Sequence, residues 1–257
     1  LTVTATGVNK VYDGTPTASV NLSDNRVAGD ALTITPGTAA FTSPSAGDGK
    51  IVNVSAIAVT GTDAGNYTWN TTATTTANIA KKPVPPSVVA PDKVYDGTTS
   101  APGTACSLSG VLAGDAVTCS GTAAFADKNV GTTKTVTLSA IALSGAAAGN
   151  YTASPATATT TADITPRPLT VTATGVNKIY DGTTTAAVTL ASNKVAADTV
   201  TLGYASASFV DTAAGTGKFI SVAGIGISGA DSGNYTLQNT TATTSANIAR
   251  RTLVVTA

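Results

Sequence analysis

The sequence predicts an all-β chain of three tandem Ig-like antiparallel β-sandwich repeats, each about 84 residues long, in an extended rod. The segment Lys10–Gly14 returns, with one conservative change, at Lys93–Gly97 and Lys178–Gly182. Short runs rich in Thr and Val are separated by Gly, Asn and Asp, and no segment has a helical period over a helix length. The period exceeds that of solenoid repeats and suits a small independent domain.

Six or seven short strands are expected in each repeat, because apolar residues alternate with Thr between turn signals. The expected strands of the third repeat are Leu169–Ala173, Asn177–Asp181, Ala187–Leu190, Thr199–Val210, Lys218–Ile227, Asn234–Leu237 and Thr240–Ile248. We expect the fourth of these strands to bend at Gly203, because glycine inside a strand favours a bend.

The predicted domain boundaries are residues 1–81, 82–166 and 167–251, with residues 252–257 as the start of a truncated fourth repeat. Each repeat runs into the next across a few basic or Pro residues, and proline fixes φ. Such short joints predict an extended array with limited bending. The first joint holds Pro83, Pro85, Pro86 and Pro91, so we expect its backbone hydrogen bonds to differ from those of the second.

Composition argues against several classes of protein. The formal net charge is zero and 11% of residues are charged, so no basic face for nucleic acid is expected. No apolar run approaches the roughly 18 residues of a membrane span. The chain contains no His and no Glu, which leaves a catalytic carboxylate without its usual partners. We therefore expect no enzymatic activity, no cofactor and no membrane insertion in this segment.

The two cysteines, Cys106 and Cys119, both lie in the second repeat. Their short separation in a strand-rich stretch predicts one local disulfide, or two reduced thiols that face each other. A disulfide fits an oxidising, extracellular setting.

Two recurring motifs are expected to be structural. Tyr-Asp-Gly is a turn signal, in which Asp bonds its own backbone and Gly accepts a positive φ. Gly-Asn-Tyr before a strand is similar to a tyrosine corner, whose hydroxyl bonds back to the backbone. The motif residues are Tyr12, Asp13, Gly14, Tyr95, Asp96, Gly97, Tyr180, Asp181 and Gly182 for the first, and Tyr67, Tyr151 and Tyr235 for the second.

A third shared motif places Asp30, Asp115 and Asp198 at the entry to a strand. Two further roles for the polar residues stay open. A calcium ion at a joint would use Asp92 or Asp163 with backbone carbonyls, although carboxylates are scattered. A Lys–Asn or Lys–Asp amide crosslink would join the motif lysine of each repeat to its last strand. The residues for such a crosslink are Lys10 with Asn78, Lys93 with Asp163, and Lys178 with Asn247.

Together these motifs resemble the YDG and related mostly-β (MBG) repeats of large bacterial surface and secreted adhesins of the filamentous-haemagglutinin type. The resemblance covers every full repeat through Tyr-Asp-Gly-Thr, Gly-Asn-Tyr and the joint pattern of Ile164–Ala173. It implies tandem extracellular domains that form a stalk, without catalytic residues. The implied location is the bacterial cell surface or the secreted fraction. The partners are then neighbouring repeats, with glycans bound by other parts of the full protein.

The sequence thus favours a non-catalytic spacer that projects a distal binding region. The alternative is a carbohydrate- or matrix-binding module with an exposed aromatic patch. Trp69, Tyr204 and nearby Asp residues are the candidates for that patch.

Overall fold

The computed structural model describes residues 1–255 and is built almost entirely of strands. Strands cover 54% of the chain and single-turn 3-10 helices 4%, which confirms the all-β prediction. The helical turns, Ala64–Asn66, Ala148–Asn150 and Ser232–Asn234, lead into Gly-Asn-Tyr tyrosines. None of the described helical segments has the length and apolar character needed to cross a membrane.

Two compact units divide the chain. The first contains Leu1–Val89, Thr104–Thr122 and Leu138–Thr159, and the second contains Ala90–Gly103, Ala123–Thr137 and Thr160–Ala257. The middle repeat contributes to both units. Consequently the junction between repeats one and two lies inside the first unit, and the junction between repeats two and three lies inside the second.

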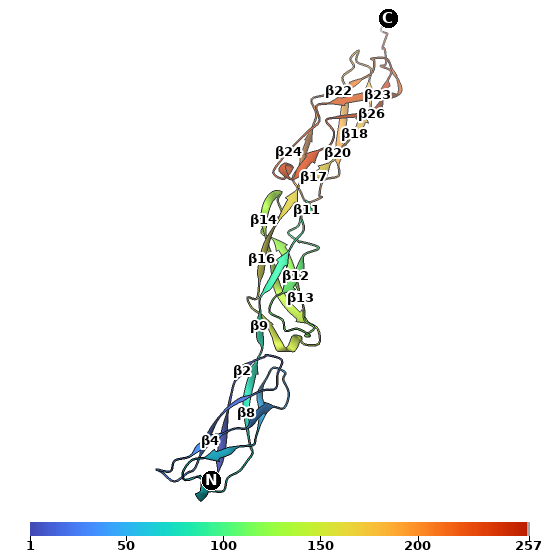
Figure 1. Cartoon of the computed structure of the whole chain (residues 1–257). Coiled ribbons are helices and arrows are strands. Elements are labelled where there is room, and N and C mark those ends of the chain that lie inside the picture. Colours follow the sequence, from blue (N-terminus) through green and yellow to red (C-terminus); the bar gives the residue numbers. More distant parts are fainter. Residues whose placement is uncertain (256–257) are drawn as a thin grey trace. The chain divides into compact units, whose positions relative to one another are not determined.

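Each repeat has the same sheet plan, drawn in Figure 1. A four-stranded sheet is formed by a short strand that pairs in parallel with the last long strand, followed by two antiparallel neighbours. The sheet orders are β2-β8-β6-β5, β11-β16-β14-β13 and β19-β26-β23-β22. Two-stranded antiparallel ladders lie beside it, such as β1-β3, β10-β12 and β18-β20.

The bounds of the strands follow the same order in every repeat. The first repeat contains β1 (Val3–Val8), β2 (Lys10–Val11), β3 (Ser19–Asp24), β4 (Thr33–Thr35), β5 (Thr38–Phe41), β6 (Gly47–Ser55), β7 (Ala58–Thr60) and β8 (Ala73–Ala80). The second contains β9 (Lys82–Val84), β10 (Pro86–Val89), β11 (Lys93–Val94), β12 (Ala105–Leu108), β13 (Thr118–Phe125), β14 (Gly131–Ser144), β15 (Tyr151–Ala153) and β16 (Ala158–Thr165). The third contains β17 (Arg167–Leu169), β18 (Val171–Val176), β19 (Lys178–Ile179), β20 (Ala187–Ser192), β21 (Thr201–Gly203), β22 (Ser206–Phe209), β23 (Gly215–Ala223), β24 (Gly226–Ser228), β25 (Tyr235–Leu237) and β26 (Thr241–Ala249).

The expected strands of the third repeat are present, but two of them are divided. The run Thr199–Val210 becomes β21 and β22, which pair with different strands on either side of the predicted bend. The run Lys218–Ile227 is likewise interrupted where Gly224 takes a φ of 68°. Because strands change partners at these points, the sheets curl and do not separate into two clean layers of an Ig-like sandwich.

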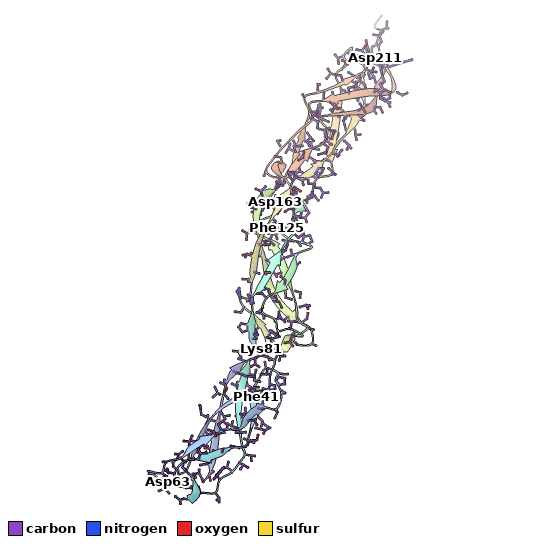
Figure 2. The ribbon with its side chains drawn as sticks, viewed as in Figure 1. Phe41, Asp63, Lys81, Phe125, Asp163 and Asp211 are labelled. Carbon is purple, nitrogen blue, oxygen red and sulfur yellow. A yellow bond between two sulfur atoms is a disulfide. The ribbon has the colours of Figure 1, made fainter. Side chains whose placement is uncertain are left out.

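The core repeats with the sequence. Phe41, Phe125 and Phe209 are each 3% exposed and lie at the end of an edge strand (Figure 2 labels the first two). On the last long strand the buried residues alternate with exposed ones, as in Ala77 and Ile79 of β8. This alternation places one face of each four-stranded sheet against the core.

The joints use the same backbone pairing in both places. Strand β9 pairs in parallel with β15, and β17 pairs in parallel with β25, in the same register. The expectation that the Pro-rich first joint loses these hydrogen bonds is wrong, because Pro83 and Pro168 occupy matching positions within the paired strands. Beyond the third repeat, residues 252–255 form no strand, and Thr256 and Ala257 of the expected fourth repeat lie outside the described residues.

Candidate functional site at the repeat junctions

The Tyr-Asp-Gly turn is built around the lysine that precedes it. Lys10 Nζ donates to Asp13 Oδ1 at 2.8 Å, and also to the carbonyl oxygens of Thr15 and Thr17. Asp13 Oδ1 accepts the backbone N–H of Thr15 at 2.9 Å, which is the local turn bond that the motif predicts. The hydrogen bond from Lys10 is the main cause that lowers the pKa of Asp13 to about 2.

The same turn recurs around Lys93 and Lys178, and each lysine also lies over a phenylalanine ring of the core. Lys10 Nζ is 5.6 Å from the centroid of Phe41, and the other two lysines are at 5.3 and 5.5 Å from theirs. This cation–π contact ties the turn to the edge strand that follows.

The residues proposed for a crosslink have other partners. The lysine amines are held in the turns just described, while the side chains of the last strand accept backbone N–H groups. Asn78, Asp163 and Asn247 accept from Gly49, Thr133 and Gly217, at 2.7 to 2.8 Å. The hydrogen bonds of the structure therefore give these side chains a structural role in each repeat.

The tyrosine of Tyr-Asp-Gly belongs to the next repeat more than to its own. Tyr12 Oη of repeat one donates to Asp115 Oδ2 of repeat two at 3.0 Å. Tyr151 Oη of repeat two donates to the same oxygen. The two rings meet edge to face, with centroids 5.4 Å apart and planes at 77°. We call this Tyr12–Asp115–Tyr151 cluster clamp 1.

An equivalent cluster holds the second junction. Tyr95 Oη of repeat two and Tyr235 Oη of repeat three donate to Asp198 Oδ2, at 2.8 and 2.6 Å. Their rings pack edge to face at 5.5 Å. We call Tyr95–Asp198–Tyr235 clamp 2. The three recurring motifs of the sequence, Tyr-Asp-Gly, Ala-Gly-Asp (Ala-Ala-Asp in the third repeat) and Gly-Asn-Tyr, therefore meet at one place.

The glycine of the first motif also faces the junction. Gly14 has a φ of 79°, and a side chain there would approach Leu112 of repeat two. Gly97, with a φ of 82°, has Val195 of repeat three in the same position. Glycine is thus required both by the turn conformation and by the close approach of the next repeat.

The third copy of the motif provides an internal comparison. Tyr12 is 6% exposed and Tyr95 is fully buried, whereas Tyr180 is 41% exposed. A Cβ atom at Gly182 would meet none of the described residues within 4 Å. The same motif is therefore buried where a repeat follows within the described residues and open where none does, so its burial comes from the junction.

The Gly-Asn-Tyr motif forms the opposite side of each clamp. The Tyr hydroxyl accepts a backbone N–H at 2.9 to 3.1 Å, from Val27, Leu112 or Val195 of its own repeat, as a tyrosine corner does. The preceding Asn reaches back to the previous repeat. Asn150 Oδ1 accepts the N–H of Ala46, and Asn234 Oδ1 accepts that of Val130, both at 2.9 Å.

Burial and hydrogen bonding shift the titration of clamp 2. Burial, followed by the hydrogen bond to Asp198, raises the pKa of Tyr235 to about 12. Burial alone would raise the pKa of Asp198, but hydrogen bonds from Tyr235, Lys128 and Tyr95 together hold it below its ordinary value. The clamp is thus an anion that two neutral phenols solvate in place of water.

Sequence reasoning assigned Asp30, Asp115 and Asp198 only to a loop and missed their role as acceptors. It also missed Lys128, whose Nζ lies 3.0 Å from Asp198 Oδ1 and 3.3 Å from Asp231 Oδ1. The available signal was the recurrence of an acidic residue and two tyrosines without a shared local partner. Each clamp joins residues 103 apart in the chain, so spacing within one repeat does not reveal it.

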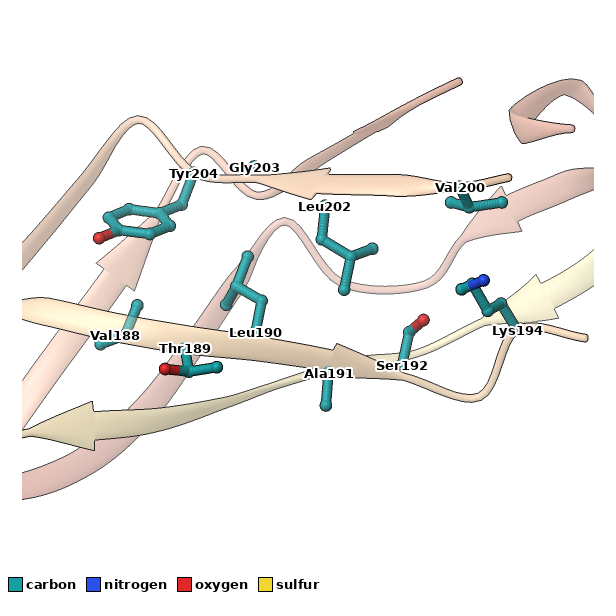
Figure 3. Close-up of a pocket in the computed structure, with 10 residues that line it drawn as sticks. All are labelled: Val188, Thr189, Leu190, Ala191, Ser192, Lys194, Val200, Leu202, Gly203 and Tyr204. Carbon is teal, nitrogen blue, oxygen red and sulfur yellow. The ribbon is translucent and has the colours of Figure 1, made fainter. Parts of the chain in front are cut away.

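The two cysteines form a disulfide between β12 and β13, with Cα atoms 5.7 Å apart. Their positions are apolar in the other repeats. Cys106 matches Leu22 and Leu190 at a spacing of 84, and Cys119 matches Ile34 and Leu202, four residues after the shared Asp. Figure 3 shows Leu190 and Leu202 pointing toward each other from β20 and β21. The disulfide therefore replaces an apolar contact.

The remaining candidates are placed apart from the clamps. Asp92 Oδ1 accepts the N–H of Asp163 at 2.7 Å, as Asn9 does for Asn78. Among residues 1–255, no group of three or more His, Cys, Asp or Glu is arranged to hold a metal ion. Trp69 is half-buried, and its Nε1 donates to the carbonyl of Ile57 at 3.1 Å.

Tyr204, in contrast, is 37% exposed and borders an open groove of about 740 Å³ between β20 and β21 (Figure 3). Leu190 and Leu202 form its floor, and Lys194 lies at its far end.

The sequence pattern of the YDG domain matches three consecutive segments, residues 1–77, 80–161 and 165–244. No curated protein matches the chain. The matched segments end near each joint and contain all three motifs that build the clamps. The chain therefore belongs to the YDG domain family and consists of three tandem YDG domains.

Proposed function

We propose that these YDG domains are a non-catalytic spacer of an extracellular bacterial adhesin, which keeps a distal binding region away from the cell surface. The observation that carries this proposal is the clamp. Residues of the three recurring motifs, the most regular features of the chain, meet at repeat junctions. Selection on an array of this kind acts on how each repeat holds its neighbour.

A clamp suits a spacer because it limits motion at the joint. Each junction combines a parallel strand pairing, a bidentate use of one carboxylate oxygen by two phenols, and an Asn contact to the previous repeat. Charge-assisted hydrogen bonds of this kind are stronger than neutral ones. In a nearest-neighbour array the length then grows with the number of repeats while every junction stays the same.

The disulfide supports an extracellular location, because such bonds persist in oxidising compartments and are rare in the cytosol. The adhesin context comes from the resemblance of the repeats to those of large surface and secreted proteins. In such a protein the partners of these repeats are other repeats, and glycans are bound elsewhere.

Small-angle scattering of the intact chain tests the spacer. Three domains held in line give a radius of gyration well above the roughly 18 Å expected for one globule of this length. A variant with both clamps weakened, Tyr12→Phe with Tyr95→Phe, should broaden the distribution of interatomic distances, while Tyr180→Phe should not. A profile near 18 Å for the unmodified chain would contradict the spacer.

A carbohydrate- or matrix-binding role is the second candidate, and the groove beside Tyr204 is the observation that favours it. An exposed aromatic ring over an apolar floor is a surface on which a sugar ring stacks. Glycan-array binding by the intact chain, lost in Tyr204→Ala and kept in Tyr180→Ala, would support this role over the spacer.

A further inference from the structure

The two junctions share a clamp but differ in charge. At junction 2, Lys128 of repeat two lies between Asp198 and Asp231 of repeat three. At junction 1 the matching positions, 84 residues earlier, are Pro44 and Ala147. Both members of the second ion pair are therefore present at one junction, and both are absent at the other.

Burial makes this difference consequential. The Asp198 side chain is 1% exposed, so its charge is removed from water and depends on nearby donors. Lys128 supplies a full positive charge at 3.0 Å, and its Nζ also lies 5.9 Å from the centre of the Tyr95 ring. Asp115 of clamp 1 is only partly buried and retains access to water.

Asp231 completes the cluster from the neighbouring loop. Its Oδ1 lies 3.3 Å from Lys128 Nζ, while its Oδ2 accepts the N–H of Thr199 at 2.8 Å. The second bond fixes the carboxylate in place before the lysine arrives. Asp63 of repeat one holds Ala31 in the same way at 2.9 Å.

We propose that Lys128, Asp198 and Asp231 form a charge key that selects which repeat follows repeat two. The partner that fits is a YDG repeat with two acidic residues 33 positions apart, as Asp198 and Asp231 are. Repeat one carries this pair as Asp30 and Asp63, whereas repeat two carries Asp115 with Ala147. A repeat with proline at the lysine position, as Pro44 is in repeat one, instead matches a follower with a single carboxylate. The order of repeats is thus written at their junctions, independently of what the array does as a whole.

The key is tested in the intact chain by the rate at which a tyrosine-specific reagent modifies each tyrosine, read by mass spectrometry. Modification of a buried tyrosine reports the population of the open junction. Lys128→Met leaves Asp198 buried without its cation, and should raise the rate at Tyr95 and Tyr235 at least about tenfold. The rates at Tyr12 and Tyr151 should stay unchanged, as internal controls for folding.

Adding Asp198→Asn to Lys128→Met provides the decisive comparison. The amide removes the uncompensated charge and still accepts a tyrosine hydroxyl, so the rates should return to within about threefold of the unmodified chain. A purely steric role for Lys128 predicts no such rescue. Unchanged rates in Lys128→Met, or no rescue in the double variant, would overturn the proposal.

The reciprocal transfer keeps the proposal testable if Lys128→Met fails to fold. Pro44→Lys with Ala147→Asp places the key at junction 1, and should slow modification of Tyr12 and Tyr151 at least about threefold relative to either single variant. A double variant no more protected than the single ones would also overturn the key.

Discussion

Replacing Tyr95 by phenylalanine removes one hydroxyl group from clamp 2 and keeps the ring that packs against Tyr235. The lost hydrogen bond is 2.8 Å long, buried, and made to a carboxylate. Hydrogen bonds to charged groups contribute about 1.5–3 kcal/mol. Because Asp198 keeps Tyr235 and Lys128, we expect the lower part of this range, about 2 kcal/mol of unfolding free energy.

Calorimetry of the intact chain measures this loss. A loss of this size in a compact unit should lower its unfolding temperature by roughly 5–10 °C. Tyr12→Phe should lower the transition of the first unit in the same way, because its hydroxyl serves clamp 1.

Tyr180→Phe is the matched control, since it makes the same chemical change in the same motif and in the same unit as Tyr95. The Tyr180 side chain is exposed and no described residue pairs with its hydroxyl, so the change should stay within about 0.5 kcal/mol. Equal shifts for Tyr95→Phe and Tyr180→Phe would refute the clamp as a stabilising contact.

Three other outcomes follow from the same contacts. A phenol whose folded-state pKa is raised stabilises the protein fully below its unfolded pKa of 10.0, and this contribution from Tyr235 is lost as pH rises from 10.0 to about 12; urea unfolding across this window should show falling stability, and a flat profile would contradict it. Cys106→Leu with Cys119→Ile should be more stable than the Ser/Ser pair, because the other repeats place apolar residues there, although it should lose about 2–3 kcal/mol against the disulfide in denaturant titration. Intact mass should equal the sequence mass less the two hydrogens of the disulfide, whereas loss of ammonia or water would reveal a Lys–Asn or Lys–Asp crosslink.

The fold class was predictable because its signals are local. Alternation with Thr, turn residues and the repeat period all lie within a few residues of one another. The bond from Asp13 to the Thr15 backbone and the corner formed by Tyr67 followed from the same short-range chemistry. Strand division at Gly224 was missed because the run before it reads as one continuous alternation.

The junction was not predictable from a single repeat, because its partners come from two. Asp115 reads as a loop residue when only its neighbours in sequence are considered, and its two tyrosine partners are contributed by different repeats. A repeat array hides such contacts further, since every residue of the clamp is present in each copy and the copy that supplies it is not marked.

Conservation of a motif within the chain and burial of its residues are therefore separate facts. Tyr12, Tyr95 and Tyr180 share one sequence context, yet the third is exposed because no following repeat is described there. What differs between copies is then as informative as what repeats. Pro44 against Lys128, and Ala147 against Asp231, change together at the two junctions, and a pair that changes together across an interface is the signature of a contact that matters to both sides.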